Sequence, residues 1–242
     1  MRKPLVIAHR GASALAVENS AEALEVAIAL HADVVEFDIR PSHDHVPICC
    51  HDPDLARLKG RAEAVASLDA QELKALGLLS LAQLLTLARG RIPLLLDCKA
   101  ETEVFFSSIA KALAQAEMEE TDIVMGVRSL SASRTARTFL PGLAQLGLLA
   151  TEAEIAPFVE SGGAFIRLWE QDVDAASMAR LRKTFHRPIW ITLGAPGRGD
   201  AGETEPVALE RVLALEPEGI LINDPRLLDA SRSFPASGRQ AS

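Results

Sequence analysis

Residues 34–50 read VVEFDIRPSHDHVPICC, and this stretch decides the fold. It holds two apolar runs, Val34–Ile39 and Val46–Cys50, which are separated by only a few polar residues. A parallel connection between neighbouring strands needs roughly a dozen or more residues. The second run therefore has to return as an antiparallel hairpin, with Pro41–His45 as its turn.

Along the rest of the chain, short apolar runs alternate with longer stretches in which apolar residues have helical spacing. This alternation is typical of a parallel sheet with helical crossovers. The runs are continuously apolar, as expected for strands that are covered on both faces. The predicted strands are Leu5–Ala8, Val34–Ile39, Val46–Cys50, Ile92–Cys98, Ile123–Val127, Gln145–Leu149, Ala164–Leu168, Pro188–Leu193 and Gly219–Ile222.

Without the hairpin strand Val46–Cys50, eight strand–helix units are left, which is the number in a (β/α)₈ barrel. The prediction is therefore an α/β fold, a (β/α)₈ TIM barrel with a β-hairpin inserted after strand 2, although an open doubly wound sheet has the same alternation. Residues 1–230 are predicted to form one domain and 231–242 a disordered tail. The clearest predicted helices are Ser20–His31, Leu81–Ala88, Glu103–Glu117, Ala175–Phe185 and Pro206–Leu215.

Composition excludes several classes of protein. The 242 residues are 48% hydrophobic, enough for one large core without disulfides, and the net charge is −8 without a cluster of Lys and Arg that would indicate nucleic-acid binding. No segment is apolar for long enough to span a bilayer, so no stable membrane anchoring is expected. Three cysteines in apolar runs indicate reduced thiols and a cytoplasmic protein. Nothing in the sequence indicates an oligomeric state.

Charged side chains occur where predicted strands end, which is the edge at which barrels and open α/β sheets build their sites. Glu36 and Asp38 are two residues apart on one strand, so their carboxylates share a face. Asp97, near the end of a later strand, could supply a third carboxylate. Buried carboxylates need a cation, and these oxygens predict one divalent ion, Mg²⁺ or Ca²⁺, with Mn²⁺ as a further option. The simpler alternative is that Glu36 and Asp38 are solvated or form salt bridges with Arg40 and Arg10.

The hairpin adds a histidine to this edge. If Asp44 and His45 form a two-residue turn, paired residues have numbers that sum to 89, and Asp38 faces His51. His51 and His9 could then act as an acid–base pair, because histidine titrates near neutral pH. Taken singly, each histidine is more often a residue satisfied by hydrogen bonds. Two cations, Arg10 and Lys99, share the same edge and suit a phosphate group.

The motifs now form a recognisable series. A-H-R-G-A (8–12), E-N-S (18–20), V-E-F-D-I (35–39), H-D (51–52) and L-D-C-K (96–99) resemble the motifs of the glycerophosphodiester phosphodiesterase family in order and spacing. Residues 190–193 and 219–225 fit its later motifs loosely, so the resemblance spans nearly the whole chain. It implies a (β/α)₈ barrel with a divalent metal that hydrolyses small-molecule glycerophosphodiesters, within lipid and glycerol metabolism, to sn-glycerol 3-phosphate and an alcohol (EC 3.1.4.46).

The resemblance also implies a role for each matching residue. Two histidines would be the acid and base of a reaction through a cyclic phosphate, two cations would hold phosphate oxygens, and three carboxylates would bind the metal. Two further carboxylates would order the loop and orient a histidine. The acid and base would be His9 and His51, and the cations Arg10 and Lys99. The metal ligands would be Glu36, Asp38 and Asp97, and the two further carboxylates Glu18 and Asp52.

The sequence departs from the family pattern at several motif positions. Asp97 stands where the family usually has Glu, and this Asp is similar to that of the related phospholipase-D toxins. Ser20 and Asn223 both replace Thr. Two alternatives therefore stay open. One is a lysophospholipase-D-like enzyme that acts on lysophospholipids, and the other is a catalytically silent barrel that binds a phosphorylated ligand. The glycine-rich segment Gly194–Glu205 could be a lid, although a mobile surface loop is the commoner explanation for such a segment.

Overall fold

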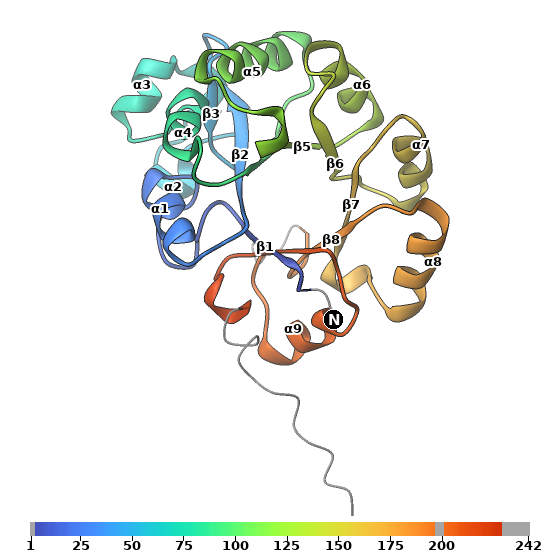
Figure 1. Cartoon of the computed structure of the whole chain (residues 1–242). Helices are drawn as coiled ribbons and strands as arrows, with labels where there is room; N and C mark the ends of the chain where they lie inside the picture. The colour runs from blue at the N-terminus through green and yellow to red at the C-terminus, as the bar shows by residue number, and fades with distance from the viewer. Residues whose placement is uncertain (1–2, 197–200, 229–242) are drawn as a thin grey trace, which may run out of the picture.

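The computed structural model describes residues 3–196 and 201–228 and forms a closed α/β barrel (Figure 1). Eight parallel strands form the barrel, which closes where β1 pairs with β2, so the predicted architecture is confirmed. The predicted tail 231–242 and part of the predicted lid lie outside the described residues. The strands are β1 Leu5–Ala8, β2 Val34–Pro41, β3 Pro47–Cys49, β4 Leu94–Cys98, β5 Ile123–Val127, β6 Ala144–Gly147, β7 Phe165–Trp169, β8 Ile189–Thr192 and β9 Gly219–Ile222.

Helices surround the ring of strands in Figure 1, and polar residues begin several of them. The hydroxyl of Ser20 accepts from the backbone N–H of Ala23 at the start of α1, and Thr102 caps α5 in the same way. Such caps satisfy N–H groups that the first helical turn leaves free. The helices are α1 Ala21–Ala29, α2 Ala56–Lys59, α3 Ala70–Ala75, α4 Leu81–Ala88, α5 Glu103–Ala116, α6 Leu130–Phe139, α7 Ile155–Glu160, α8 Ala175–Phe185 and α9 Pro206–Leu213.

Alternating residues of the strands face opposite sides of the barrel wall. Outward residues such as Val35, Phe37 and Ile39 are fully buried beneath the helices. Inward residues pack into a separate apolar cluster that fills the barrel, in which the rings of Trp190 and Phe165 are 4.6 Å apart. The other buried members of this inner cluster are Ile7, Val34, Leu95, Leu146, Leu148 and Leu221. A barrel of this type has a packed interior and is not a pore.

The hairpin forms, but its predicted register is wrong by one residue. Arg40 pairs with Ile48 and Ile39 with Cys49, so paired numbers sum to 88, and the residue whose N–H donates to the Asp38 carbonyl is Cys50. The loop is longer than expected because His45 takes a left-handed conformation with φ of 62°. Such a residue after a tight turn gives a three-residue loop in place of a two-residue one. His51 therefore does not face Asp38 across the hairpin.

The inner cluster generates a stability prediction. Trp190 is 2% exposed, and Trp190→Ala should lower the free energy of unfolding by about 3–5 kcal/mol, because the lost contacts leave a cavity in the barrel. Val207→Ala, at a residue that is 78% exposed, should change it by less than about 0.5 kcal/mol. Urea denaturation followed by circular dichroism measures both, and equal effects would contradict a packed barrel interior.

Candidate active site

The candidate site consists of the inward positions directly above the apolar cluster. On β2, Val34 belongs to the inner cluster, and the next residues on the same face are Glu36 and Asp38. On β4, Leu95 is followed in the same way by Asp97. The same alternation carries β1 from Ile7 to His9, β7 from Phe165 to Arg167 and Trp169, and β9 from Leu221 to Asn223. The carboxyl end of the barrel is therefore lined with polar groups over an apolar floor.

Three carboxylates converge at this level. Asp38 and Asp97 are register partners on neighbouring strands, and one oxygen from each, together with one from Glu36, lies within 4.8 Å of the others. All three residues are buried. Burial and the neighbouring carboxylates of Asp38 and Asp97 raise the pKa of Glu36 well above its ordinary value. A buried group of hard oxygen atoms with this excess of negative charge fits a divalent cation of the Mg²⁺ or Ca²⁺ type.

Protein cations already neutralise two of these carboxylates. The Lys99 ammonium lies 2.8 Å from Asp38 and 2.5 Å from Asp97, and Arg10 Nε lies 3.3 Å from Asp38. Arg128 donates to both oxygens of Asp97, from Nε at 3.0 Å and from Nη2 at 2.5 Å. Burial opposes the ionisation of Asp38 and Asp97, but these cations outweigh it and lower the pKa of both. Both oxygens of Asp97 are therefore engaged by Arg128, and one of them is also engaged by Lys99.

A hydrogen-bond network fixes the orientation of His9. The side-chain amide of Asn223 donates from Nδ2 to the Ala201 carbonyl, so its oxygen faces His9 Nδ1 at 2.7 Å. His9 Nδ1 must then donate, which leaves Nε2 as the unprotonated nitrogen, 3.9 Å from Glu36. Gly202 allows this approach, because a Cβ there would lie 2.7 Å from His9 Nδ1 and its φ is +83°.

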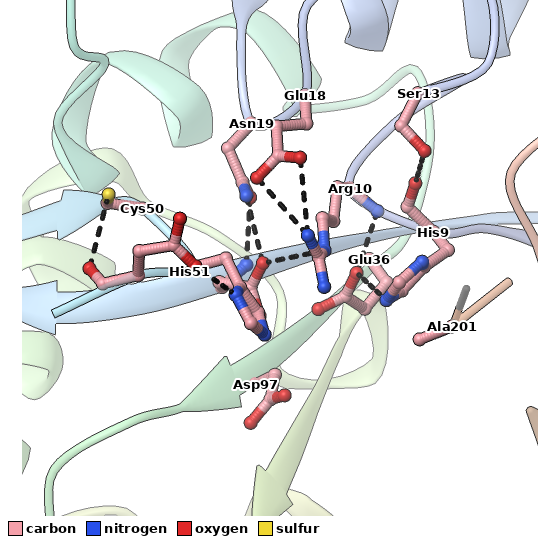
Figure 2. A network of polar contacts seen from close by, with 12 residues as sticks. His9, Arg10, Ser13, Glu18, Asn19, Glu36, Cys50, His51, Asp97 and Ala201 are labelled. Atoms are coloured by element: carbon pink, nitrogen blue, oxygen red, sulfur yellow. Dashed lines mark hydrogen bonds and ion pairs between the residues drawn. The ribbon is translucent and has the colours of Figure 1, made fainter. Parts of the chain in front are cut away.

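His51 lies on the other side of Glu36 from His9 in Figure 2. Its Nδ1 is 2.7 Å from Asp52, and Arg57 donates to the same carboxylate at 2.6 Å. Arg57 also binds Glu18, which accepts from Arg10 Nη1 at 3.2 Å. The chain therefore reaches the barrel mouth after β3 despite the different hairpin register, and both predicted supporting carboxylates lie in one network of ion pairs there.

A cleft opens above these groups, with a volume of about 660 Å³. His9, Arg10, His51 and Arg128 line it, and they also line a deeper hollow of about 60 Å³ that reaches the apolar floor. All of the residues predicted for catalysis, phosphate binding and the metal therefore come together around one cavity, except that Asp38 lies behind its surface.

Comparison with known proteins agrees with this geometry. The model of the glycerophosphoryl diester phosphodiesterase family matches residues 9–131, which is half of the chain and includes every predicted site residue. The chain belongs to this family.

Two eukaryotic members of the family are similar to this chain over shorter segments. Lysophospholipase D GDPD3 from mouse is 42% identical over 66 residues, which are 27% of this chain and 20% of that protein. Glycerophosphodiester phosphodiesterase GDPD4 from Arabidopsis thaliana is 32% identical over 116 residues, 48% of this chain and 34% of that protein. The matched segments thus span about a third of these relatives or less.

Solved phosphodiesterases share the fold over nearly the whole chain. The glycerophosphodiester phosphodiesterase of Thermotoga maritima has a TM-score of 0.77 at 20% identity and covers 96% of this chain and 100% of its own. An Oleispira antarctica phosphodiesterase, in complex with the product sn-glycerol-3-phosphate, has a TM-score of 0.82 at 16% identity and covers 96% and 98%. These likenesses confirm the barrel.

Several residues of this candidate site were not predicted from the sequence. The side-chain amide of Asn19 donates to the Asp38 carboxylate and accepts from the Asp38 backbone N–H. Other walls of the cavity are formed by Arg128, Arg167, Trp169 and Asn223. Arg128 directly follows the apolar run of β5. It therefore has the same sequence signal as His9 and Lys99, a charged or polar residue at the end of a strand. Arg167 interrupts the apolar sequence of β7, and a charge within a buried strand is itself a signal.

The environment of His9 generates a pH prediction. Burial, and next the charge of Arg10, lower its pKa from 6.5 to about 4. Between these two pH values the unfolded chain binds more protons, so this group makes stability fall as pH falls. In the metal-free protein, the NMR signals of the His9 ring should not titrate from about pH 5.5 to 8. The His9→Gln variant identifies these signals by their absence. If they titrate near pH 6.5 in the wild type, the lowered pKa of His9 is contradicted.

Proposed function

We propose that the protein hydrolyses glycerophosphodiesters to sn-glycerol 3-phosphate and an alcohol, the reaction of EC 3.1.4.46. The observation that carries this proposal is the placement of two differently held histidines beside a buried carboxylate triad, in a cleft lined by arginines. Membership of the phosphodiesterase family supports the class of reaction. The sn-glycerol-3-phosphate held by the Oleispira antarctica relative supports the choice of product.

The three carboxylates are proposed to hold one divalent ion, Mg²⁺ or Ca²⁺ in preference to Mn²⁺. Glu36 is the most available of them, since within the described chain its side chain accepts one hydrogen bond, from the backbone N–H of Arg10 at 2.7 Å. When bound, such an ion would act as a Lewis acid that neutralises charge on the phosphate. The shorter side chain of Asp97 lies within 4.8 Å of the other oxygens, so its length does not remove it from the triad.

Phosphate oxygens are proposed to bind Arg10 and Lys99. Arg10 donates from Nη1 to Glu18, and its Nε forms an ion pair with Asp38. Within the described chain, neither Nε nor Nη2 has a hydrogen-bond partner. The guanidinium is thereby held rigidly, with one edge available for an oxyanion. Lys99 is buried between two carboxylates, which raise its pKa against the effect of burial, so it stays charged and screens them from the phosphate.

The two histidines are proposed to divide the proton transfers. His9 Nε2 is unprotonated and accepts the proton of the substrate hydroxyl next to the phosphate, whose oxygen then attacks phosphorus. His51, whose Nδ1 is hydrogen-bonded to Asp52, donates a proton to the departing alcohol as its P–O bond breaks. The products of this step are a cyclic phosphate and the alcohol. Water then opens the ring, with His51 accepting its proton and His9 returning the other.

A second candidate is lysophospholipase D activity. The similarity to mouse lysophospholipase D GDPD3 favours it, and the cleft has a volume of about 660 Å³. Product analysis by mass spectrometry distinguishes the two candidates, because lysophospholipids leave an acyl chain on the phosphate product.

We further propose a cytoplasmic protein in which residues 1–230 act as one domain. The three cysteines, Cys49, Cys50 and Cys98, are buried and form no disulfide, which suits a reducing compartment. In the described part of the chain, no helix has the length and hydrophobicity needed to cross a membrane.

Substitution of the histidines tests the mechanism. His9→Ala and His51→Ala should each lower kcat for glycerophosphoethanolamine by about 10²- to 10⁴-fold, because each removes a positioned acid or base. His43→Ala, at a histidine whose side chain is 69% exposed, should not change it. Full activity of either active-site variant would contradict the assigned roles, and absence of turnover in the wild type with every divalent ion would overturn the proposed function.

Metal removal tests the triad separately from turnover. EDTA should abolish activity, and calorimetry of the metal-free protein should show one Mg²⁺ or Ca²⁺ site that Glu36→Gln weakens by at least about tenfold, since a charged ligand is lost. Arg128→Gln should instead strengthen binding, because Asp97 is freed from its bidentate partner. Unchanged affinity in Glu36→Gln would exclude this residue as a ligand.

A further inference from the structure

Arg167 is a buried cation that the catalytic scheme does not use. It lies on β7, its exposed fraction is 9%, and it lines the hollow beneath the cleft. Within the described chain its side chain forms no hydrogen bond and no ion pair, and its Nε is buried without a partner. An unpaired buried guanidinium is costly, so it requires an explanation.

The surroundings of Arg167 favour an anion. Its guanidinium lies 4.5 Å from the ring centre of Trp169, which holds the side chain in place. The floor of the hollow is formed by Leu95, Leu148 and Leu221, so water screens little of its charge. Burial, and next Arg128, lower the pKa of Arg167 only to about 10, so it stays cationic at neutral pH.

Other counter-charges nearby are already engaged or distant. Asp97 and Asp172 act on Arg167 electrostatically, but neither forms an ion pair with it. Both oxygens of Asp97 accept from Arg128, and one of them also binds Lys99. Arg10 likewise binds Glu18 and Asp38. Arg167 is therefore, among the arginine and lysine side chains that line the deep hollow in the described chain, the one without a carboxylate partner.

The position of β7 in the barrel determines which part of a substrate would reach Arg167. Around the closed ring, β7 is four strands from β2 in either direction, so Arg167 lies across the mouth from Glu36 and Asp38. A phosphodiester bound between β1, β2 and β4 would extend one of its two organic groups toward β7. That group would meet Arg167 and Trp169.

We propose that Arg167, together with Trp169, forms a second anion subsite, which holds a carboxylate or phosphate on the alcohol portion of the substrate. This inference rests on the proposed phosphodiesterase function and narrows its substrate class to diesters with a second negative group. An arginine fork suits either oxyanion, since both accept two parallel hydrogen bonds. A trimethylammonium group such as that of choline would meet a like charge at the same place.

Two pairs of substrates test the subsite. Glycerophosphoserine and glycerophosphoethanolamine differ by one carboxylate, and glycerophosphoglycerol differs from its terminal phosphate ester by one phosphate. In the wild type, kcat/KM should be at least about tenfold higher for the anionic member of one pair or both, the lower range for a charge-assisted hydrogen bond. The pair that responds identifies the preferred oxyanion, and equal values within both pairs would overturn the proposal.

Variants show whether Arg167 is responsible. In Arg167→Gln the ratio within the responding pair should fall to about one, and Arg167→Lys should keep part of it. The matched control is Arg137→Gln, because Arg137 on α6 also has buried guanidine nitrogens without partners but lies against Gly162, away from the cleft. Its ratio should equal that of the wild type. A ratio in Arg167→Gln that equals the wild-type value would also overturn the proposal.

A binding measurement separates this proposal from the proposed function. O-phosphoserine and phosphoethanolamine are not diesters and differ by the same carboxylate, so calorimetry measures the subsite without turnover. Tighter binding of phosphoserine by at least about tenfold, lost in Arg167→Gln, would support the subsite even if no diester were hydrolysed. Equal affinities in a protein that hydrolyses both esters of the serine–ethanolamine pair equally would exclude a carboxylate subsite while leaving the phosphodiesterase function intact.

Discussion

The structure depends on how three buried carboxylates are neutralised at the mouth of the barrel. Glu36, Asp38 and Asp97 extend from neighbouring strands over an apolar floor, where charge repulsion is weakly screened. Lys99 and Arg128 offset part of this charge, but Glu36 is left with neighbouring carboxylates that favour its protonated form. Such a cluster is stable only with a cation at its centre or a proton on Glu36. That requirement links the fold to a site that could hold a metal ion.

Neutralisation by protein cations also sets limits on the chemistry. Each cation that pairs with a carboxylate is less available to a substrate, and Arg128 competes directly with a metal for Asp97. The two histidines of the site, His9 and His51, differ in their hydrogen-bond partners. Asn223 holds His9 with Nε2 unprotonated, whereas His51 is oriented through Nδ1 by Asp52. The proposed division of the proton transfers between the two histidines depends on this difference in hydrogen-bond partners.

Much of this arrangement could be predicted from the sequence. Every barrel strand was placed within two residues of its observed start, because covered parallel strands are continuously apolar, and the strand ends indicated the level of the site. The hairpin register was wrong because it depends on His45, a residue whose positive φ has no strong sequence signal. Asn223 and Arg167 were missed for another reason. Asn223 matters because it binds His9, and Arg167 because its side chain lacks a partner, and both facts depend on the closed barrel.

Anomalous diffraction from crystals that contain Mn²⁺ tests the central claim most directly, that inward carboxylates above the apolar floor form a metal site. We expect one strong peak about 2.0–2.6 Å from oxygens of Glu36, Asp38 and Asp97, with Arg128 withdrawn from at least one Asp97 oxygen. Absence of a peak at saturating Mn²⁺, with Arg128 still bound to both oxygens, would show that protein cations alone neutralise the cluster, and would contradict the account.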